Sequence, residues 1–176
     1  LLADKGNGNY AYIDSMFEAK KALVDELGAN MVTVAKDVKL QVEFNPAQVK
    51  GYRLIGYENR VMAAEDFADD TKDGGEMGAG HSVTALYEII PADSEMELPE
   101  TDLKYGETAQ VLICGTEDYT DELFTANIRY KEPDGEESKL ESYPCKTENY
   151  NKDGSDNLRF AASVAAFGML LKDSEY

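Results

Sequence analysis

Residues 38–46 read Val-Lys-Leu-Gln-Val-Glu-Phe-Asn-Pro, and this alternation of apolar and polar side chains sets the fold class. Successive side chains of a strand point to opposite faces, so the pattern predicts a half-buried strand. Proline cannot donate to a β-ladder and holds the preceding residue extended, so Asn45-Pro46 ends that strand. The predicted buried face carries the apolar side chains Val38, Leu40, Val42 and Phe44.

Similar patterns follow along the chain, separated by turn residues, and they predict about six antiparallel strands. The further strands cover residues 52–57 with Gly56 as a candidate bulge, 82–90, 109–114, 124–130 and 138–143. Many short strands with turns between them favour a β-sandwich. The predicted fold class is therefore α+β, mainly β: an antiparallel β-sandwich with a helix at each end.

The first helix follows a short predicted strand at residues 9–13. Ser15 and Glu18 have the spacing of a capping box, and Gly28 supplies a stop signal. One face of this helix carries the apolar side chains Met16, Ala19, Leu23 and Leu27. A single strand and helix cannot bury such a face without other elements.

The second helix, at residues 158–171, is apolar nearly all round, which predicts burial on more than one side. Its bulky stripe, expected to pack on the sandwich, comprises Phe160, Val164, Phe167 and Leu171. Its small residues, which would allow a neighbouring backbone to approach, are Ala161, Ala165 and Gly168.

The net charge of −18, from 35 acidic and 17 basic residues, argues against several classes of partner. Such a charge repels phosphate backbones and anionic lipid, so we expect no nucleic-acid binding. No segment reaches the ~18 apolar residues that span a bilayer, so we expect no membrane insertion by this segment. The two cysteines, Cys114 and Cys145, are too few for a disulfide scaffold and lack zinc-site spacing, and whether they bond to each other stays open.

Two sequence blocks identify a family resemblance. Residues 44–60 read FNPAQVKGYRLIGYENR, and residues 73–88 read DGGEMGAGHSVTALYE. Both resemble the module that follows a von Willebrand factor A (VWA) domain in bacterial proteins of the YfbK type. Residues 6–24 resemble the last strand and helix of the VWA domain itself. The resemblance implies a VWA remnant at residues 1–28 and a separate module at residues 29–176.

The same resemblance carries expectations about cofactors, partners and location. A VWA domain binds its metal through a D-x-S-x-S motif in its first strand-to-helix loop, which would lie upstream, and no such motif occurs in this chain. We therefore expect no cofactor here, an intramolecular contact with the upstream VWA domain, and a protein ligand. Members of this kind are often exported to the bacterial cell envelope or periplasm, sometimes as lipoproteins, although the residues themselves assign no compartment.

The candidate interface residues are Tyr52, Arg53, Tyr57 and Arg60, because Tyr and Arg are enriched at interface hot spots. Arg53 and Tyr57 are expected to share one face of a strand. The same side chains could instead serve as core aromatics or pair internally, for example Arg53 with Glu58.

We predict a non-catalytic interaction or scaffold module, with no catalytic or metal-binding residue, and two alternatives stay open. The first is a hydrolase that uses His81, the single histidine. A nucleophilic mechanism would need an orienting acid and a nucleophile beside it, whereas His81 next to a glycine-rich segment favours a structural role. The second is a Ca²⁺-stabilised extracellular module using the acidic loop around Asp69–Asp73, where Gly80 replaces the closing Glu of an EF-hand.

Overall fold

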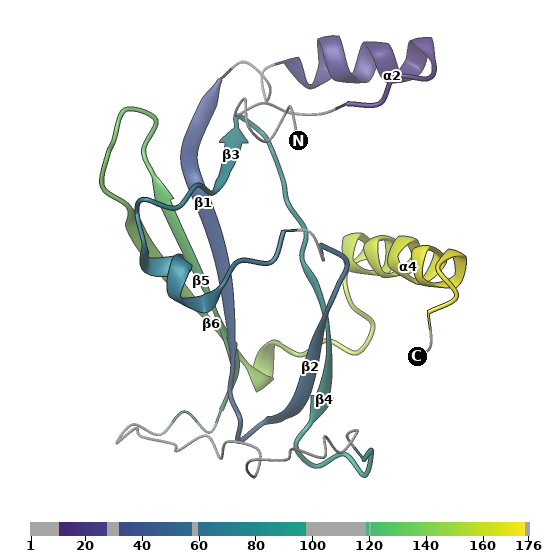
Figure 1. The fold of residues 1–176 in the computed structure, drawn as a ribbon. Helices are drawn as coiled ribbons and strands as arrows, with labels where there is room; N and C mark the ends of the chain where they lie inside the picture. The colour runs from purple at the N-terminus through teal and green to yellow at the C-terminus, as the bar shows by residue number, and fades with distance from the viewer. Residues whose placement is uncertain (1–10, 28–31, 58–59, 98–118, 120, 175–176) are drawn as a thin grey trace. The chain divides into compact units, whose positions relative to one another are not determined.

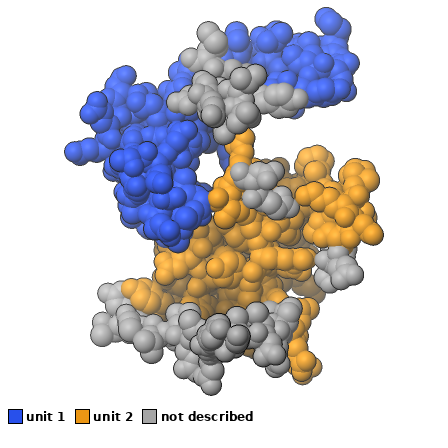
Figure 2. Space-filling model, in the orientation of Figure 1, with its two compact units in different colours: residues 1–41, 62–83, 126–143 blue, residues 42–61, 84–125, 144–176 orange. Residues whose placement is uncertain are grey.

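The computed structural model describes residues 11–27, 32–57, 60–97, 119 and 121–174. The predicted class is confirmed, because the chain is α+β and mainly β, with two antiparallel sheets and two helices (Figure 1). It divides into two compact units, each made of three segments (Figure 2). Unit 1 comprises residues 1–41, 62–83 and 126–143, and unit 2 comprises residues 42–61, 84–125 and 144–176.

The larger sheet has four strands in the order β3-β1-β5-β6. Their bounds are Thr33–Phe44 for β1, Gly75–Gly78 for β3, Glu122–Lys131 for β5 and Lys139–Lys146 for β6. β3 was not expected, because its glycine-rich sequence indicated a loop. It pairs with β1 in an antiparallel but irregular register, with shifts on either side of Ala35. Asp37, at a φ of 51°, lies within the second irregularity.

A glycine is required where the chain enters β3. A Cβ on Gly74 would lie 2.5 Å from the carbonyl carbon of Asp37, which is far too close for any other residue. The amide of Gly74 also donates a hydrogen bond of 3.2 Å to Oδ1 of Asp37. The glycine-rich block therefore serves close approach of the chain to the bulged part of β1.

The alternation predicted for β1 is wrong at two positions. Lys39 is 5% exposed, whereas Leu40 is 47% exposed. The reason is the 3₁₀-helix η2, Ala64–Ala68, and the turn after it, whose carbonyl oxygens accept hydrogen bonds from the Lys39 ammonium. The two carbonyl oxygens compensate for the loss of water around the buried ammonium group. The alternation of apolar and polar residues along a strand carries no information about acceptors from a distant segment.

The smaller sheet pairs β2, Val49–Ile55, with β4, Leu86–Pro91, in antiparallel register. β2 ends one residue before Gly56, which has a φ of 79°, and Tyr57 follows at 59°. The two residues therefore form a left-handed turn after the strand, and the predictions that Gly56 bulges a strand and that the strand reaches Tyr57 are wrong. β4 also starts later than expected, because residues 82–85 are not in a strand.

The first helix begins as predicted at Ser15, whose Oγ accepts from the Glu18 amide at 3.2 Å. α2, Met16–Lys20, continues into the π-helix η1, Lys21–Asp25. Ala22 is its one buried residue among those described, and Met16 is 86% exposed. Met16, Leu23 and Leu27 of the predicted apolar face are exposed, whereas Ala19 is partly covered. Residues 11–13 are not in a strand, contrary to the prediction, while residues 9–10 lie outside the described residues.

The C-terminal part of unit 2 contains the short 3₁₀-helix η3, Thr147–Asn149, and then α4, Asp156–Leu171. The Ser155 hydroxyl accepts from the Leu158 amide at 3.1 Å and caps the helix, which starts two residues before the predicted position 158. The expected burial is wrong, since α4 has no buried residue. The predicted strand at residues 109–114 lies outside the described residues.

Candidate protein-interaction surface

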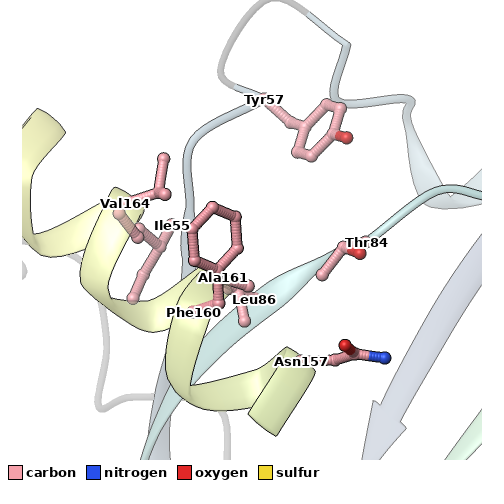
Figure 3. Close-up of a pocket in the computed structure, with 9 residues that line it drawn as sticks. Ile55, Tyr57, Thr84, Leu86, Asn157, Phe160, Ala161 and Val164 are labelled. Carbon is pink, nitrogen blue, oxygen red and sulfur yellow. The ribbon is translucent and has the colours of Figure 1, made fainter.

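An open groove of about 490 Å³ lies in unit 2 between α4 and the β2–β4 pair (Figure 3). Figure 3 shows Phe160 and Val164 of α4 close to Ile55 and Leu86 of the strands. The full lining comprises Ile55, Tyr57, Thr84, Leu86, Asn157, Phe160, Ala161, Val164 and Ala165. Most of these side chains are apolar, and none carries a formal charge at neutral pH.

The orientation of α4 reverses the sequence prediction. Its partly covered residues are mostly small: Ala161, Ala165, Ala166, Gly168 and Met169. Its bulky residues are exposed, with Phe160 at 73% and Phe167 at 62%, although Phe160 and Val164 line the open groove. The bulky stripe that was expected to pack on the sandwich is therefore exposed, and of its members Phe160 and Val164 line the groove beside β2 and β4.

Arg53 lies on the same face of the β2–β4 sheet as the strand residues of the groove. It stands opposite Glu88 in register and forms an ion pair with it. Ile55 and Leu86 stand opposite each other two positions along. Because alternate residues of a strand share a face, the charged pair lies beside the groove floor. The suggested alternative partner, Glu58, lies outside the described residues.

Tyr52 points to the other face of that sheet and joins an aromatic cluster. Its ring stacks on Phe44 with centroids 4.2 Å apart, and Tyr87 and Phe124 approach the same Phe44 ring at 5.3 and 5.8 Å. Burial, with a smaller contribution from Tyr52, raises the pKa of the Tyr87 hydroxyl. Tyr52 is therefore a partly exposed edge of an aromatic core around Phe44.

The four predicted interface residues are thus not one patch. Tyr57 lines the groove, although its left-handed backbone places it beyond the strand that carries Arg53. Arg60 is exposed, and its amide donates to the Tyr57 carbonyl at 2.8 Å within the turn. The structure brings Tyr57 and Arg53 near α4 and directs Tyr52 elsewhere. Their role at an interface stays a prediction.

Asn45 is a structural residue that the sequence analysis treated only as a strand terminator. Its side-chain amide donates to the carbonyl oxygens of Tyr119 and Glu122 at 2.8 and 2.7 Å. Its Oδ1 accepts from the Ala47 amide at 3.0 Å. An Asn before Pro is a turn signal, and that signal could have indicated the local contact, but not the two contacts across 74 and 77 positions.

The acidic loop of unit 1 is bonded within the unit. Asp69 accepts from the amide and hydroxyl of Thr71, and Asp70 accepts from the Ser138 amide. The Lys39 ammonium donates to the Asp69 carbonyl at 2.6 Å. Among the described residues, no group of three or more His, Cys, Asp or Glu side chains is arranged to hold a metal ion. Calcium binding by this loop remains a prediction.

Two carboxylates near the β1 bulge have pKa values shifted in opposite directions. Burial would raise the pKa of Asp37, but hydrogen bonds from Lys131, at 2.7 Å, and from the Gly74 amide hold it below its usual value. For Glu76 on β3, burial followed by the charges of Asp37 and Asp73 raises the pKa, and the smaller opposing effect of Lys36 does not offset them. The surroundings of the bulge therefore favour the ionised form of Asp37 and disfavour the ionised form of Glu76.

His81 lies in a turn of unit 1, where its amide donates to the Gly78 carbonyl at 3.0 Å. The residue is exposed, and the groove is lined by residues of unit 2. This hydrogen bond involves the main chain of His81, so a structural role for its side chain stays a prediction. The hydrolase alternative gains no acid or nucleophile from these contacts.

Two further predictions concern sulfur chemistry and the membrane. Cys145 is a free, partly buried thiol, and Cys114 lies outside the described residues. Within the described part of the chain, no helix combines the length and apolarity needed to cross a bilayer.

Comparison with known proteins places this chain in a family. Residues 29–176 match the family model described as "Uncharacterized protein YfbK, C-terminal". The chain is similar to the Uncharacterized protein YfbK of Escherichia coli (strain K12), with 43% identity over 176 residues, which is 99% of this chain and 29% of that relative. No solved structure matches. The predicted resemblance is confirmed, and the chain belongs to the YfbK C-terminal family.

Proposed function

We propose that this chain is a non-catalytic protein-interaction module and that its binding surface is the α4 groove of unit 2 together with the bulky stripe of α4. The observation that carries the proposal is the orientation of α4. Its small residues are partly covered, whereas its large apolar residues, two of which line the groove, are exposed to solvent. A contiguous exposed apolar surface on a water-soluble domain marks an interaction site more often than it marks chance.

The chemistry of the groove supports binding rather than catalysis. Among the nine lining residues, Tyr57 is the one with an ionisable side chain, and the rest are apolar, hydroxyl or amide groups. An acyl- or phosphoryl-transfer site needs a nucleophile beside a base, together with a group that stabilises developing charge. An apolar groove with a few polar groups and a charged pair at its edge fits a polypeptide ligand.

We further propose that the module is attached to a preceding domain of the VWA type, with residues 1–28 as its last strand and helix. The family model begins at residue 29, and the chain spans 29% of the length of its E. coli relative. α2 precedes that boundary and carries exposed apolar residues, including Met16 and Phe17. An apolar helix face without cover in its own unit fits packing against a neighbouring domain.

Site-specific photo-crosslinking in cells tests the binding surface. A photoreactive phenylalanine analogue at position 167 of the full-length protein should give a discrete adduct, identified by mass spectrometry. The analogue at Ala162 is the control, because this exposed residue lies on α4 but outside the bulky stripe. Tyr57→Ala should weaken the adduct from position 167, because Tyr57 lines the groove.

Equal yields from positions 167 and 162, or no adduct from either, would contradict the proposed surface. An adduct that is insensitive to Tyr57→Ala would exclude the groove as part of it. Peptides from another region of the same chain would identify the upstream domain as the ligand.

A further inference from the structure

One ion pair of unit 1 joins two neighbouring strands and holds an amine against a carboxyl group. Nζ of Lys131 on β5 lies 2.7 Å from Oδ2 of Asp37 on β1, and β1 and β5 are adjacent in the sheet. These side chains are 13% and 22% exposed, whereas those of the Lys139–Glu132 pair in the same unit are 55% and 60% exposed. The fold therefore shields the first pair from most of the solvent and keeps its two groups together.

Further contacts fix both groups for a reaction at the carboxyl carbon of Asp37. The amide of Gly74 donates to Oδ1 of Asp37 at 3.2 Å, and this N–H can stabilise negative charge that develops on that oxygen. The ammonium of Lys131 also donates to the Asp70 carbonyl at 3.0 Å, which holds the nitrogen beside the carboxyl group. Such fixed proximity removes much of the entropic cost of bringing an amine and a carboxyl group together.

Another carboxyl group lies beside the pair. Glu76 on β3 falls within the second register shift of the β1–β3 ladder, so this one residue stands opposite both Lys36 and Asp37. Burial, followed by the charges of Asp37 and Asp73, raises the pKa of Glu76. The side chain of Asp73 also approaches the Asp37 carboxyl group. A carboxyl group with a raised pKa retains its proton more readily, and it can then act as a general acid.

We propose that Lys131 and Asp37 form an intramolecular isopeptide bond, with Glu76 as the group that transfers protons. A proton first passes from the Lys131 ammonium to the Asp37 carboxylate. The neutral amine then attacks Cγ of Asp37, and the N–H of Gly74 stabilises the oxyanion on Oδ1. Glu76 donates its proton to the Oδ2 hydroxyl, which leaves as water, and regains a proton from the amine nitrogen. The products are one amide and one water, so the reaction needs no oxidant and no other reactant.

The charges of the ion pair make the reaction slow. Although burial acts against it, the hydrogen bond from Lys131 lowers the pKa of Asp37, and the same hydrogen bond raises the pKa of Lys131. The reactive neutral pair is therefore scarce. Freshly folded protein contains the ion pair, and the amide accumulates as the folded protein ages. Because a cross-link between distant positions restricts the unfolded chain, the joined protein should resist unfolding more than the fresh protein.

Peptide mapping by mass spectrometry tests the proposal on the full-length protein, kept folded for a week at neutral pH and body temperature. The expected product is a branched peptide that joins the segments around positions 37 and 131 and has lost the mass of one water. Lys131→Arg keeps a positive charge opposite Asp37 but lacks the amine, so it should give no branched peptide. The exposed Lys139–Glu132 pair is the internal control and should stay unjoined.

Glu76→Gln tests the proton transfer, because glutamine keeps the size of the side chain but cannot give up and regain a proton. The branched peptide should form more slowly by about tenfold or more. In the unmodified protein its formation should accelerate as pH falls from neutral toward the raised pKa of Glu76, and the variant should lose this dependence. The charged groups that face Glu76 are Lys36 and Asp37 on β1 and Asp73 before β3. Asp73→Asn is the matched control and should keep the pH dependence.

Circular dichroism verifies that each variant is folded. An unmodified protein that yields no branched peptide would overturn the inference. So would loss of one water that persists in Lys131→Arg, because the dehydration would then lie elsewhere, for example in a succinimide at Asp73. A reaction that stops in Asp73→Asn but continues unchanged in Glu76→Gln would remove Glu76 from the mechanism.

Discussion

The acidic loop of unit 1 and the α4 surface of unit 2 handle side chains in opposite ways. In unit 1, Lys39 is buried against two carbonyl oxygens and Lys131 pairs with Asp37. In unit 2, an aromatic cluster around Phe44 is stacked, yet the largest apolar side chains of α4 face solvent. The first region bonds these two lysines, although Nε of Arg129 in the same unit is buried without a hydrogen bond, and the second leaves apolar surface exposed.

The difference teaches where to look for a partner. A buried charge without hydrogen bonds is costly, so folding forces such contacts to be completed inside the unit. Exposing an apolar side chain to water costs less free energy than burying a charge without hydrogen bonds. A second molecule can remove that cost by covering the side chain. The contacts of the charged loop therefore contribute to stability, whereas the exposed apolar residues of α4 are where the proposed partner would bind.

The largest expected effect is at the aromatic cluster. Phe44→Ala removes the ring on which Tyr52, Tyr87 and Phe124 converge, and should lower the free energy of unfolding by about 3 kcal/mol. Urea denaturation measures this change. A loss below about 1 kcal/mol would mean that the cluster is not the core of unit 2 and would break the comparison.

Lys39→Met should cost about 2 kcal/mol, because it keeps most of the side-chain volume but removes the cation bonded to the Asp66 and Asp69 carbonyls. Lys72→Met is the matched control, since Lys72 is half exposed and pairs with Asp66 at 3.3 Å. That exposed pair should contribute less than about 0.5 kcal/mol. If urea denaturation showed equal decreases in the free energy of unfolding for the two variants, burial of Lys39 would add nothing to its contribution.

Asp37→Asn should cost about 1.5 kcal/mol at neutral pH, since it removes a charge-assisted bond to Lys131. The pKa of Asp37 is below its usual 3.8, so its contribution is present above pH 3.8 and is lost as pH falls through the lowered value. Thermal melts from pH 7 to pH 2 should show the two proteins converging in acid. A constant difference across this range would indicate loss of packing rather than loss of charge.

Glu76→Gln should change stability in the opposite direction and by less. The pKa of Glu76 is above its usual 4.5, so ionisation costs the folded state free energy, and the variant should melt at a higher temperature at pH 7. The advantage should vanish as pH falls below 4.5, where both side chains are neutral. A destabilised variant at pH 7 would show that the carboxylate makes a favourable contact instead.

The smallest effect is expected on α4. Phe167→Ser should change the free energy of unfolding, measured by urea denaturation, by less than about 0.5 kcal/mol, because the ring is 62% exposed. A loss comparable with that of Phe44→Ala would show that the stripe belongs to the core of unit 2 after all. The contrast between the two aromatic positions would then disappear.

Local signals were the reliable part of the sequence. The cap at Ser15 is where the spacing of Ser15 and Glu18 predicted it, and β1 ends before Pro46 as that proline requires. β3 was missed because its glycines carry no hydrophobic period, and its strand conformation comes from pairing with β1. The sequence could indicate which residue types suit an interface, but not the face of the sheet on which each candidate lies. One reason is that the turn at Gly56 reorients Tyr57 after β2.

By itself, the sequence determined the family, the mainly β class, the strand and helix types and the acidic charge, because these depend on composition, short periods and neighbouring residues. Only the tertiary structure decided which side of each element is covered. Lys39 is buried and Phe167 exposed because distant segments supply carbonyl oxygens to the first and α4 turns its small residues, rather than this ring, toward the module. Burial is a property of what packs against a residue, and a period along one strand or helix does not contain that information.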